Sequence, residues 1–311
     1  MQEVAPNVYV ETSYEGANCG LVITDAGGVV IDTPIIPADA KDWAAQVVSM
    51  TDNILFVFNT DYDRAHILGN QFFEAPVLAH EAAWKEMVNY KDTYIERTKS
   101  LFKKRSDIQK QFNETRIVKP ELTFTGKLIM KKGNRELHFV HLGGHSPATS
   151  GLYLPDANIL FSGDFLVVQQ HPALGDCDSK EWIAKLKWLK RQAYALIVPG
   201  HGPLCNVEAI DPIIHYTRVM RAKVRDQYKQ GRTKAESAVV ISQMIDCFPY
   251  KPGTKSIIEK RIRAGVSRLY DEMKIIYGFS HAKSATMTGR RKNAKDQNGT
   301  TVDAKLEKVV G

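Results

Sequence analysis

Three side chains that can hold a metal ion follow one apolar run in the first quarter of the chain. Residues 54–58 (ILFVF) form a short apolar run of the kind found in strands buried on both faces. The polar segment 59–66 comes next; it contains Asp61, Asp63 and His66, and its first residues favour the start of a helix. Ligands of layered α/β proteins usually bind just beyond the carboxyl ends of strands. These three side chains are therefore candidate ligands of a divalent metal ion.

Three later segments repeat this order of an apolar strand, a tight glycine turn and a side chain that can bind metal. They are residues 139–146 with His145, residues 159–164 with Asp164, and residues 196–202 with His201. A first-row divalent ion needs several deprotonated nitrogen or oxygen donors aimed at one point, and no single segment provides them. We therefore expect the four turns to meet at one edge of the fold.

In this order the four segments resemble the metal-binding motifs of the metallo-β-lactamase-fold hydrolase superfamily, over roughly residues 5–205. The first family motif is His-x-His-x-Asp-His, and residues 61–66 (DYDRAH) stand at its place in this chain. His145, Asp164 and His201 match the later family positions. The resemblance implies an α/β fold, an αββα sandwich of two mixed β-sheets flanked by helices.

The resemblance also implies one or two divalent metal ions as cofactors, with zinc, iron or manganese as the candidates. By position the metal ligands form two groups, with Asp164 as the bridge between them: Asp61, Asp63 and His145 in the first, His66 and His201 in the second. Carboxylates at positions 61 and 63 favour harder ions than imidazoles do. Ala65 replaces the family aspartate and has no donor, so we expect one bound ion, or one tight and one labile ion.

The activity implied is hydrolysis of a small ester, lactone, thioester or amide by a metal-bound hydroxide, with Asp164 and His66 as the catalytic residues. Three alternatives stay open. A degenerate relative would keep the fold as a binding protein, and a mono-iron oxygenase would use the same two histidines and one carboxylate for O₂ chemistry. A nuclease of this fold is the third, and the charge distribution does not favour it.

Several other polar residues lie near the motifs. Asp32 follows an apolar strand at residues 29–31, and it either holds a metal ligand by a hydrogen bond or caps the following turn. His80, His138 and His141 also lie in or beside predicted strands. We expect these three histidines to have no metal role.

Composition is that of a globular protein, with 43% hydrophobic and 25% charged residues, so a large core can be buried. No apolar run approaches the ~20 residues of a membrane span, and the first residues lack the features of a signal peptide. The four cysteines (Cys19, Cys177, Cys205 and Cys247) are scattered, which predicts reduced thiols and no thiolate site. We expect a cytoplasmic protein with a small-molecule substrate and no membrane partner.

The net charge of +7 is unevenly distributed, because residues 280–311 carry +4 of it. A nucleic-acid partner is therefore not favoured, and this segment is expected to be a basic, disordered tail. Residues 1–205 are predicted to form the αββα core and residues 206–279 three helices packed on it. Those helices are expected to shape the substrate entrance or to make a homodimer contact.

Overall fold

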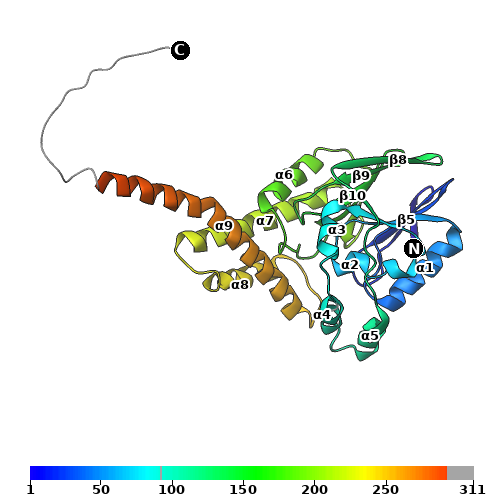
Figure 1. The fold of residues 1–311 in the computed structure, drawn as a ribbon, viewed down its shortest axis with the longest axis horizontal. Helices are drawn as coiled ribbons and strands as arrows, with labels where there is room; N and C mark the ends of the chain where they lie inside the picture. The colour runs from blue at the N-terminus through cyan, green and yellow to red at the C-terminus, as the bar shows by residue number, and fades with distance from the viewer. Residues whose placement is uncertain (92, 293–311) are drawn as a thin grey trace, which may run out of the picture.

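The computed structural model describes residues 1–91 and 93–292, with side chains described as far as residue 278. Two β-sheets pack face to face and helices cover their outer faces (Figure 1). The predicted αββα sandwich of two mixed sheets is thereby confirmed.

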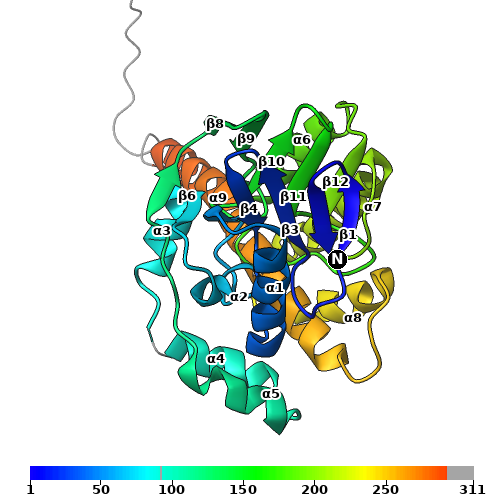
Figure 2. The ribbon, with the colours of Figure 1, turned by 90° about the vertical axis from the view of Figure 1, so that its right-hand side faces the viewer.

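The first sheet has seven strands in the order in which they occur in the chain. They are β1 (Gln2–Ala5), β2 (Val8–Glu11), β3 (Cys19–Thr24), β4 (Gly27–Ile31), β5 (Ile54–Asn59), β6 (Val77–His80) and β7 (Leu122–Phe124). Strands β1 to β4 are antiparallel neighbours, whereas β4 to β7 pair in parallel. A parallel pair needs a crossover, and helix α1 (Pro37–Met50) supplies it between β4 and β5. Its buried Trp43 and Val47 cover the outer face of this sheet, as Figure 2 shows for the helix.

The second sheet has five strands in the order β12-β11-β10-β9-β8. They are β8 (Lys127–Lys132), β9 (Arg135–His141), β10 (Ser150–Leu154), β11 (Ile159–Val167) and β12 (Leu196–His201). Three of the four strand pairs are antiparallel. The pair β11–β12 is parallel, and helix α6 (Ser179–Leu189) forms its crossover.

Aromatic side chains fill the space between the two sheets. Phe58 and Phe139 come from opposite sheets, and their rings meet edge to face with centroids 4.9 Å apart. Phe56 reaches the same Phe139 ring at 5.7 Å. Such edge-to-face pairs add to the hydrophobic gain of burial, so this contact fixes β5 against β9 just below the candidate ligands.

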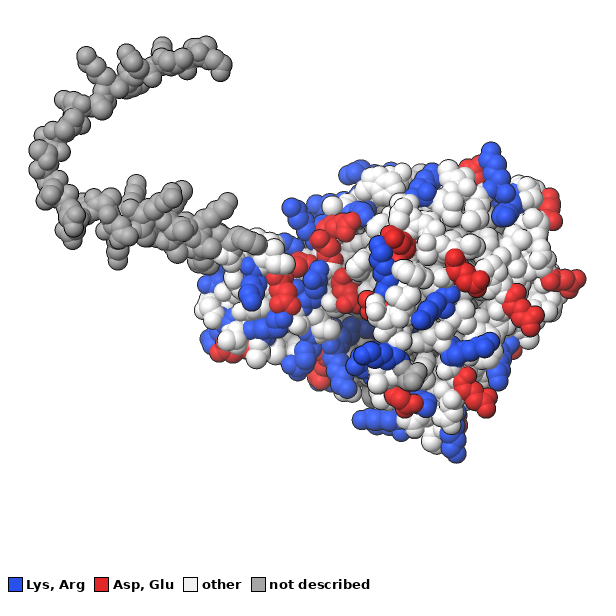
Figure 3. Space-filling view, viewed as in Figure 1, with Lys and Arg blue, Asp and Glu red and all other residues white. Residues whose placement is uncertain are grey.

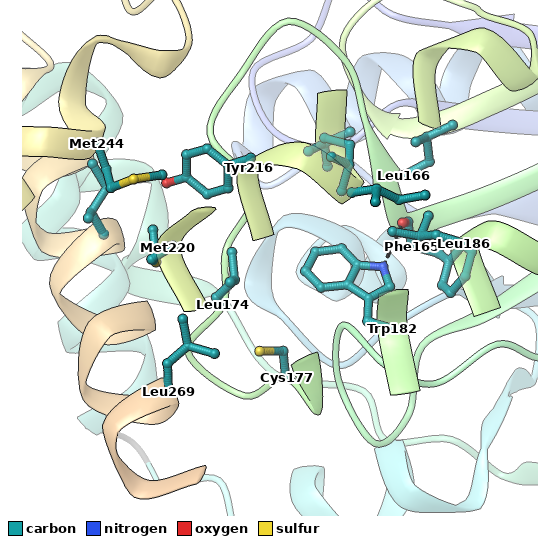
Figure 4. Close-up of a cluster of buried hydrophobic side chains, with 14 of the residues drawn as sticks. Phe165, Leu166, Leu174, Cys177, Trp182, Leu186, Tyr216, Met220, Met244 and Leu269 are labelled. Atoms are coloured by element: carbon teal, nitrogen blue, oxygen red, sulfur yellow. Dashed lines mark hydrogen bonds between the residues drawn. The ribbon is translucent and has the colours of Figure 1, made fainter. Parts of the chain in front are cut away.

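Helices of the carboxyl-terminal third form a block beside the second sheet. They are α7 (Ile210–Lys229), α8 (Val240–Met244) and α9 (Lys255–Lys292), with three short 3-10 turns at Val207–Ala209, Glu236–Val239 and Ile245–Cys247. Helix α7 packs against α6 and β11 of the second sheet, and the other two helices pack against α7. Figure 4 shows their shared core, in which Met220 and Leu269 lie with Leu174. Trp182 of α6 is buried in the same core, and its indole N–H donates a hydrogen bond to the Phe165 carbonyl at 3.0 Å.

The segment between β6 and β7 contains α3 (Glu81–Met87), α4 (Thr93–Leu101), α5 (Ser106–Gln111) and a 3-10 turn at Phe112–Glu114. Phe102 and Phe112 of this segment pack with Ile67 and Leu68. These last two residues end α2 (Arg64–Ile67) and follow it, so the segment covers the helix that carries His66.

Helix α9 extends beyond residue 279, where the three predicted helices were expected to end, and it projects from the body of the molecule (Figure 1). It continues through residues 280–292, where the sequence predicted the start of a disordered tail. Alanine, methionine, lysine and arginine in that stretch are good helix formers, which net charge alone does not reveal. The rest of the predicted tail, residues 293–311, lies outside the described residues. Among the helices described, none combines the length and the apolar character needed to cross a membrane.

Candidate metal centre

The predicted ligand segments meet at one edge of the sandwich. His66 lies on α2, which follows β5, and His145 lies in the turn between β9 and β10. Asp164 lies within β11, which continues past the predicted turn, and His201 is the last residue of β12. β11 has an irregular register at Gly163, whose φ of +51° favours glycine. A Cβ atom at that position would come within 2.4 Å of the Thr60 hydroxyl, so glycine lets β11 approach the end of β5.

His66, Asp164 and His201 bring one ligand atom each to within 4.8 Å of one another. The two carboxylate oxygens of Asp164 face different histidines: Oδ1 lies 3.2 Å from His201 Nε2, and Oδ2 lies 3.6 Å from His66 Nε2. His145 approaches from a third side, with its Nε2 atom 3.8 Å from the same Oδ2. Three imidazoles therefore surround one carboxylate.

Asp32 fixes the orientation of the His66 ring. Its Oδ2 atom lies 2.9 Å from His66 Nδ1 and also accepts a hydrogen bond from the Thr60 hydroxyl at 2.6 Å. Its Oδ1 atom accepts from the Thr60 backbone N–H at 2.8 Å. The His66 Nδ1 proton is thus directed to Asp32, and the Nε2 atom is turned toward Asp164. Of the two interpretations of Asp32, the structure supports the hydrogen bond to a candidate ligand.

Buried polar atoms of this cluster lack hydrogen-bond partners among the described residues. They are His66 Nε2, His145 Nδ1 and Asp164 Oδ1. The contact of Asp164 Oδ1 with His201 is close but does not have the geometry of a hydrogen bond. Buried polar atoms are rarely left unpaired in proteins. The unpartnered atoms of His66 and Asp164 both belong to the three converging donors, and this donor set fits a divalent metal ion.

The electrostatics of the cluster favour charged side chains. Burial acts to lower the pKa of His66, but the charges of Asp32 and Asp164 outweigh it and raise this pKa well above its usual value. Burial acts to raise the pKa of Asp164, but His201 and His66 hold it well below its usual value. Asp164 is therefore ionised at neutral pH, which is the form that binds a cation.

The structure engages Asp61 in hydrogen bonds within the protein. The hydroxyl of Ser146 donates to its carboxylate, with Oγ 2.9 Å from each oxygen, and the Thr149 hydroxyl donates to Oδ2 at 2.6 Å. The backbone N–H of Tyr62 donates to Oδ1 at 2.8 Å. Burial raises the pKa of Asp61, and the imidazoles of His145 and His66 oppose this shift.

Asp63 lies outside the cluster, at the N-terminus of α2. Its Oδ1 atom accepts from the backbone N–H of Ala65 at 3.0 Å, the usual interaction of a helix-capping aspartate. About half of its side chain is exposed, and its Oδ2 atom lies 3.8 Å from Arg64 Nε. The predicted first group of ligands is thus not brought together: Asp63 caps a helix, Asp61 binds hydroxyl groups, and His145 faces Asp164.

The histidines predicted to have no metal role lie outside the three-residue cluster. His80 caps α3, with its Nδ1 accepting from the Ala82 N–H at 3.1 Å, and its ring stacks on His141 with centroids 3.9 Å apart. The ring of His138 contacts the carboxylate of Glu136.

Two residues that the sequence reasoning did not single out have a direct role in this site. Ser146 and Thr149 supply the hydroxyl groups that bind Asp61. Their spacing directly after His145 is a short-range turn signal, because serine and threonine hydroxyls often bind nearby backbone groups. The contact with Asp61 spans 85 residues or more, and no local pattern reveals it.

Comparison with known proteins identifies the family of this chain and several relatives. A family model described as the metallo-beta-lactamase superfamily matches residues 14–201. A linear primary-alkylsulfatase from Pseudomonas sp. is 25% identical over 146 residues, which cover 44% of this chain and 27% of that protein. A metallo-beta-lactamase type 2 from Bacteroides fragilis is 33% identical over 98 residues, which cover 30% of this chain and 39% of that protein. The matched segments thus span about a quarter to two fifths of the lengths of these relatives.

Solved structures share the fold. A metallo-beta-lactamase family protein from Thermus thermophilus has a TM-score of 0.61 and 15% identity, over 87% of this chain and 95% of its own. A stereoselective inverting sec-alkylsulfatase from Pseudomonas sp. has a TM-score of 0.64 and 14% identity, over 87% of this chain and 49% of its own. At these identities the likeness concerns the fold alone.

Proposed function

Because the chain belongs to the metallo-beta-lactamase superfamily, we propose that it is a metal-dependent hydrolase that uses one divalent ion held by His66, Asp164 and His201. The observation that carries the proposal is the convergence of these three donors within 4.8 Å. Two of them, His66 Nε2 and Asp164 Oδ1, are buried and have no hydrogen-bond partner among the described residues.

The bound ion would supply an activated water molecule and a positive charge at the bond under attack. The residues of the chain prepare that chemistry. Asp32 binds the Nδ1 side of the His66 ring and so directs its Nε2 atom toward Asp164, and Asp164 supplies a negative charge at neutral pH. Both effects exist before any ligand arrives, so the site is organised by the fold.

The substrate class proposed is a small ester, lactone, thioester or amide. Two relatives add specific members to the first assays: a sulfate ester, from the likeness to the alkylsulfatase, and a lactam amide, from the likeness to the β-lactamase. A nucleic-acid substrate has less support, because on the face drawn in Figure 3 the Lys and Arg side chains are interspersed with Asp and Glu.

A mono-iron oxygenase is the second candidate, since two histidines and one carboxylate also suit iron and O₂. The degenerate binding protein is the third. The metal content of protein purified without added metal separates the third candidate from the others. Hydrolysis by the zinc, iron and manganese forms, compared with oxygen consumption by the iron form, separates the first two.

Variants locate the site. Asp164→Ala and His201→Ala should abolish stoichiometric metal binding, because each removes one of the three converging donors. His80→Ala and His138→Ala are matched controls, since they remove histidines that lie outside the cluster, and both should retain the metal content of the wild type. Equal losses from the controls would show that the metal binds elsewhere.

A further inference from the structure

We infer that Asp61 is a positioning residue that fixes the turn carrying His145 and so brings this histidine to the same metal ion as His66, Asp164 and His201. The inference rests on the proposed function for the presence of that ion. It gives Asp61 a role different from the one its place in the family motif implies.

Asp61 is buried and its hydrogen-bonding capacity is used within the protein. Only 2% of its surface is exposed, and both oxygens accept hydrogen bonds, from two hydroxyl groups and one backbone N–H. Hydrogen bonds to a carboxylate are stronger than those between neutral groups. Ligation of a metal by Asp61 would require that these bonds be broken.

The two hydroxyl groups that bind Asp61 also hold the turn after His145 together. Ser146 Oγ accepts from the backbone N–H groups of Ala148 and Thr149, each at 3.1 Å. Thr149 Oγ1 accepts from the Ser146 N–H at 2.9 Å. Asp61 therefore accepts hydrogen bonds from a closed set of turn interactions, and its removal would leave a buried hydroxyl without its partner.

His145 depends on this turn for its orientation. The ring of His66 is held by Asp32, whereas His145 Nδ1 has no partner among the described residues. Besides its contact with Asp164, the backbone N–H of His145 donates to the Gly143 carbonyl at 2.9 Å, and its ring meets Trp182 edge to face at 5.2 Å. The backbone of the turn thus decides where His145 Nε2 points.

The turn directs His145 to the cluster of the other ligands. His145 Nε2 lies 3.8 Å from Asp164 Oδ2, and His66 Nε2 lies 3.6 Å from the same oxygen. Asp61 and Asp63, which the family motif would place with His145 on one metal ion, make other contacts here. Asp63 caps α2, and Asp61 accepts hydrogen bonds from the turn. His145 is not among the three donors that already converge within 4.8 Å, so it would complete a set of four donors, three of them imidazoles, by moving closer to the ion.

The decisive variant is Asp61→Asn, which is nearly isosteric but leaves one acceptor oxygen for the hydroxyl and N–H donors. X-ray absorption of the zinc-loaded proteins should count three imidazoles in the wild type and two in the variant, at one zinc per chain in both. Competition with a chelator should show a loss of zinc affinity of about 10–100-fold, as is usual when a group that orients a ligand is removed.

The metal-free proteins give an independent readout. Asp61→Asn should lower the melting temperature of chelator-treated protein by several degrees, since the turn contacts exist without metal. Asp63→Asn is the matched control: it makes the same charge change in the same motif, and asparagine caps helices as well as aspartate does. It should change neither the imidazole count nor the melting temperature.

A milder variant tests the same contact in case Asp61→Asn does not fold. Thr149→Val removes one donor and leaves Asp61 intact, so it should shift both readouts in the same direction by less. Combined with Asp61→Asn it should add little, because both changes break the same contact.

A count of three imidazole ligands at the zinc ion of Asp61→Asn would overturn the inference. An unchanged melting temperature of the metal-free variant would also overturn it. The inference would also fail if the wild type binds two zinc ions tightly and both Asp61→Asn and Asp63→Asn bind only one. If the wild type binds no metal, the proposed function fails. The melting of the metal-free variants still decides whether Asp61 holds the turn.

Discussion

The Nδ1 atom of His66 lies 2.9 Å from Asp32 Oδ2, so a residue just beyond β4 sets the orientation of a candidate ligand on α2. Asp32 adopts a left-handed backbone conformation, with φ of +53°. Aspartate tolerates this region better than most residues with a side chain. Its carboxylate is buried and also binds both the backbone and the side chain of Thr60.

Asp32→Asn should weaken zinc binding by about 10–100-fold, because asparagine also tolerates the backbone conformation but removes the charge that holds the His66 Nδ1 proton. Competition with a chelator measures the effect. Asp25→Asn, in the exposed turn between β3 and β4, is the matched control and should bind zinc as the wild type does. Equal affinities in the two variants would show that Asp32 does not act on His66.

The sequence predicts the elements of this edge well because each depends on local pattern. A few neighbouring residues are enough to recognise the apolar strands, the end of β5, and the glycine turns at His145 and His201. The roles of Asp61 and Asp63 are different. A carboxylate after a strand looks the same whether it binds metal, caps a helix or accepts from hydroxyl groups. Only the distant Ser146 and Thr149 distinguish these cases for Asp61.

Gly144→Ala should destabilise the protein far more than Gly126→Ala. Both glycines have left-handed backbones, with φ of +74° and +68°, so an alanine costs ~1–2 kcal/mol of backbone energy at either site. At Gly144 the new Cβ atom would also lie 2.7 Å from the Trp182 Cα atom, whereas nothing lies within 4 Å at Gly126. We expect a loss of more than ~3 kcal/mol for Gly144→Ala, measured by urea unfolding.

The same pair of glycine variants also tests the turn that carries His145. Gly144 precedes His145, so Gly144→Ala should reduce zinc affinity in whatever fraction folds, and Gly126→Ala should not. Similar stabilities for the two variants would mean that the turn can move away from Trp182.

His80 should make the protein less stable as the pH falls from about 6.5 to 4. Burial and the neighbouring His141 lower the pKa of His80 to about 4, whereas the unfolded chain takes up the proton near pH 6.5. Between these values the unfolded state binds more protons, so stability is lost as the pH falls. His80→Asn keeps a helix-capping side chain and removes this titration.

Urea unfolding of the two metal-free proteins at several pH values measures this contribution. The free energy of unfolding of the wild type minus that of His80→Asn should decrease steadily from pH 7 to pH 4. A difference that stays constant over this range would show that His80 is protonated as easily in the folded protein as in the unfolded chain.

Ala65→Asp should tighten the binding of the single zinc ion. Ala65 is buried, precedes His66 on α2, and stands where the family motif has an aspartate that binds the same metal as that histidine. In the metal-free protein the new carboxylate would lie unpaired in a region that already holds Asp61 and Asp164, so it should lower stability. Zinc relieves that repulsion, and a gain of about 10-fold or more in affinity is expected, with a larger rise in melting temperature on zinc addition than in the wild type.

Ala65→Asn separates charge from size, because asparagine has nearly the same shape as aspartate and no charge. It should lower the stability of the metal-free protein without strengthening zinc binding. Titration of zinc into the three proteins should give one equivalent in each. A second tight equivalent in Ala65→Asp, or already in the wild type, would show that Asp61 and His145 form a metal site of their own. Unchanged affinity in Ala65→Asp would show that position 65 does not face the ion that His66 binds.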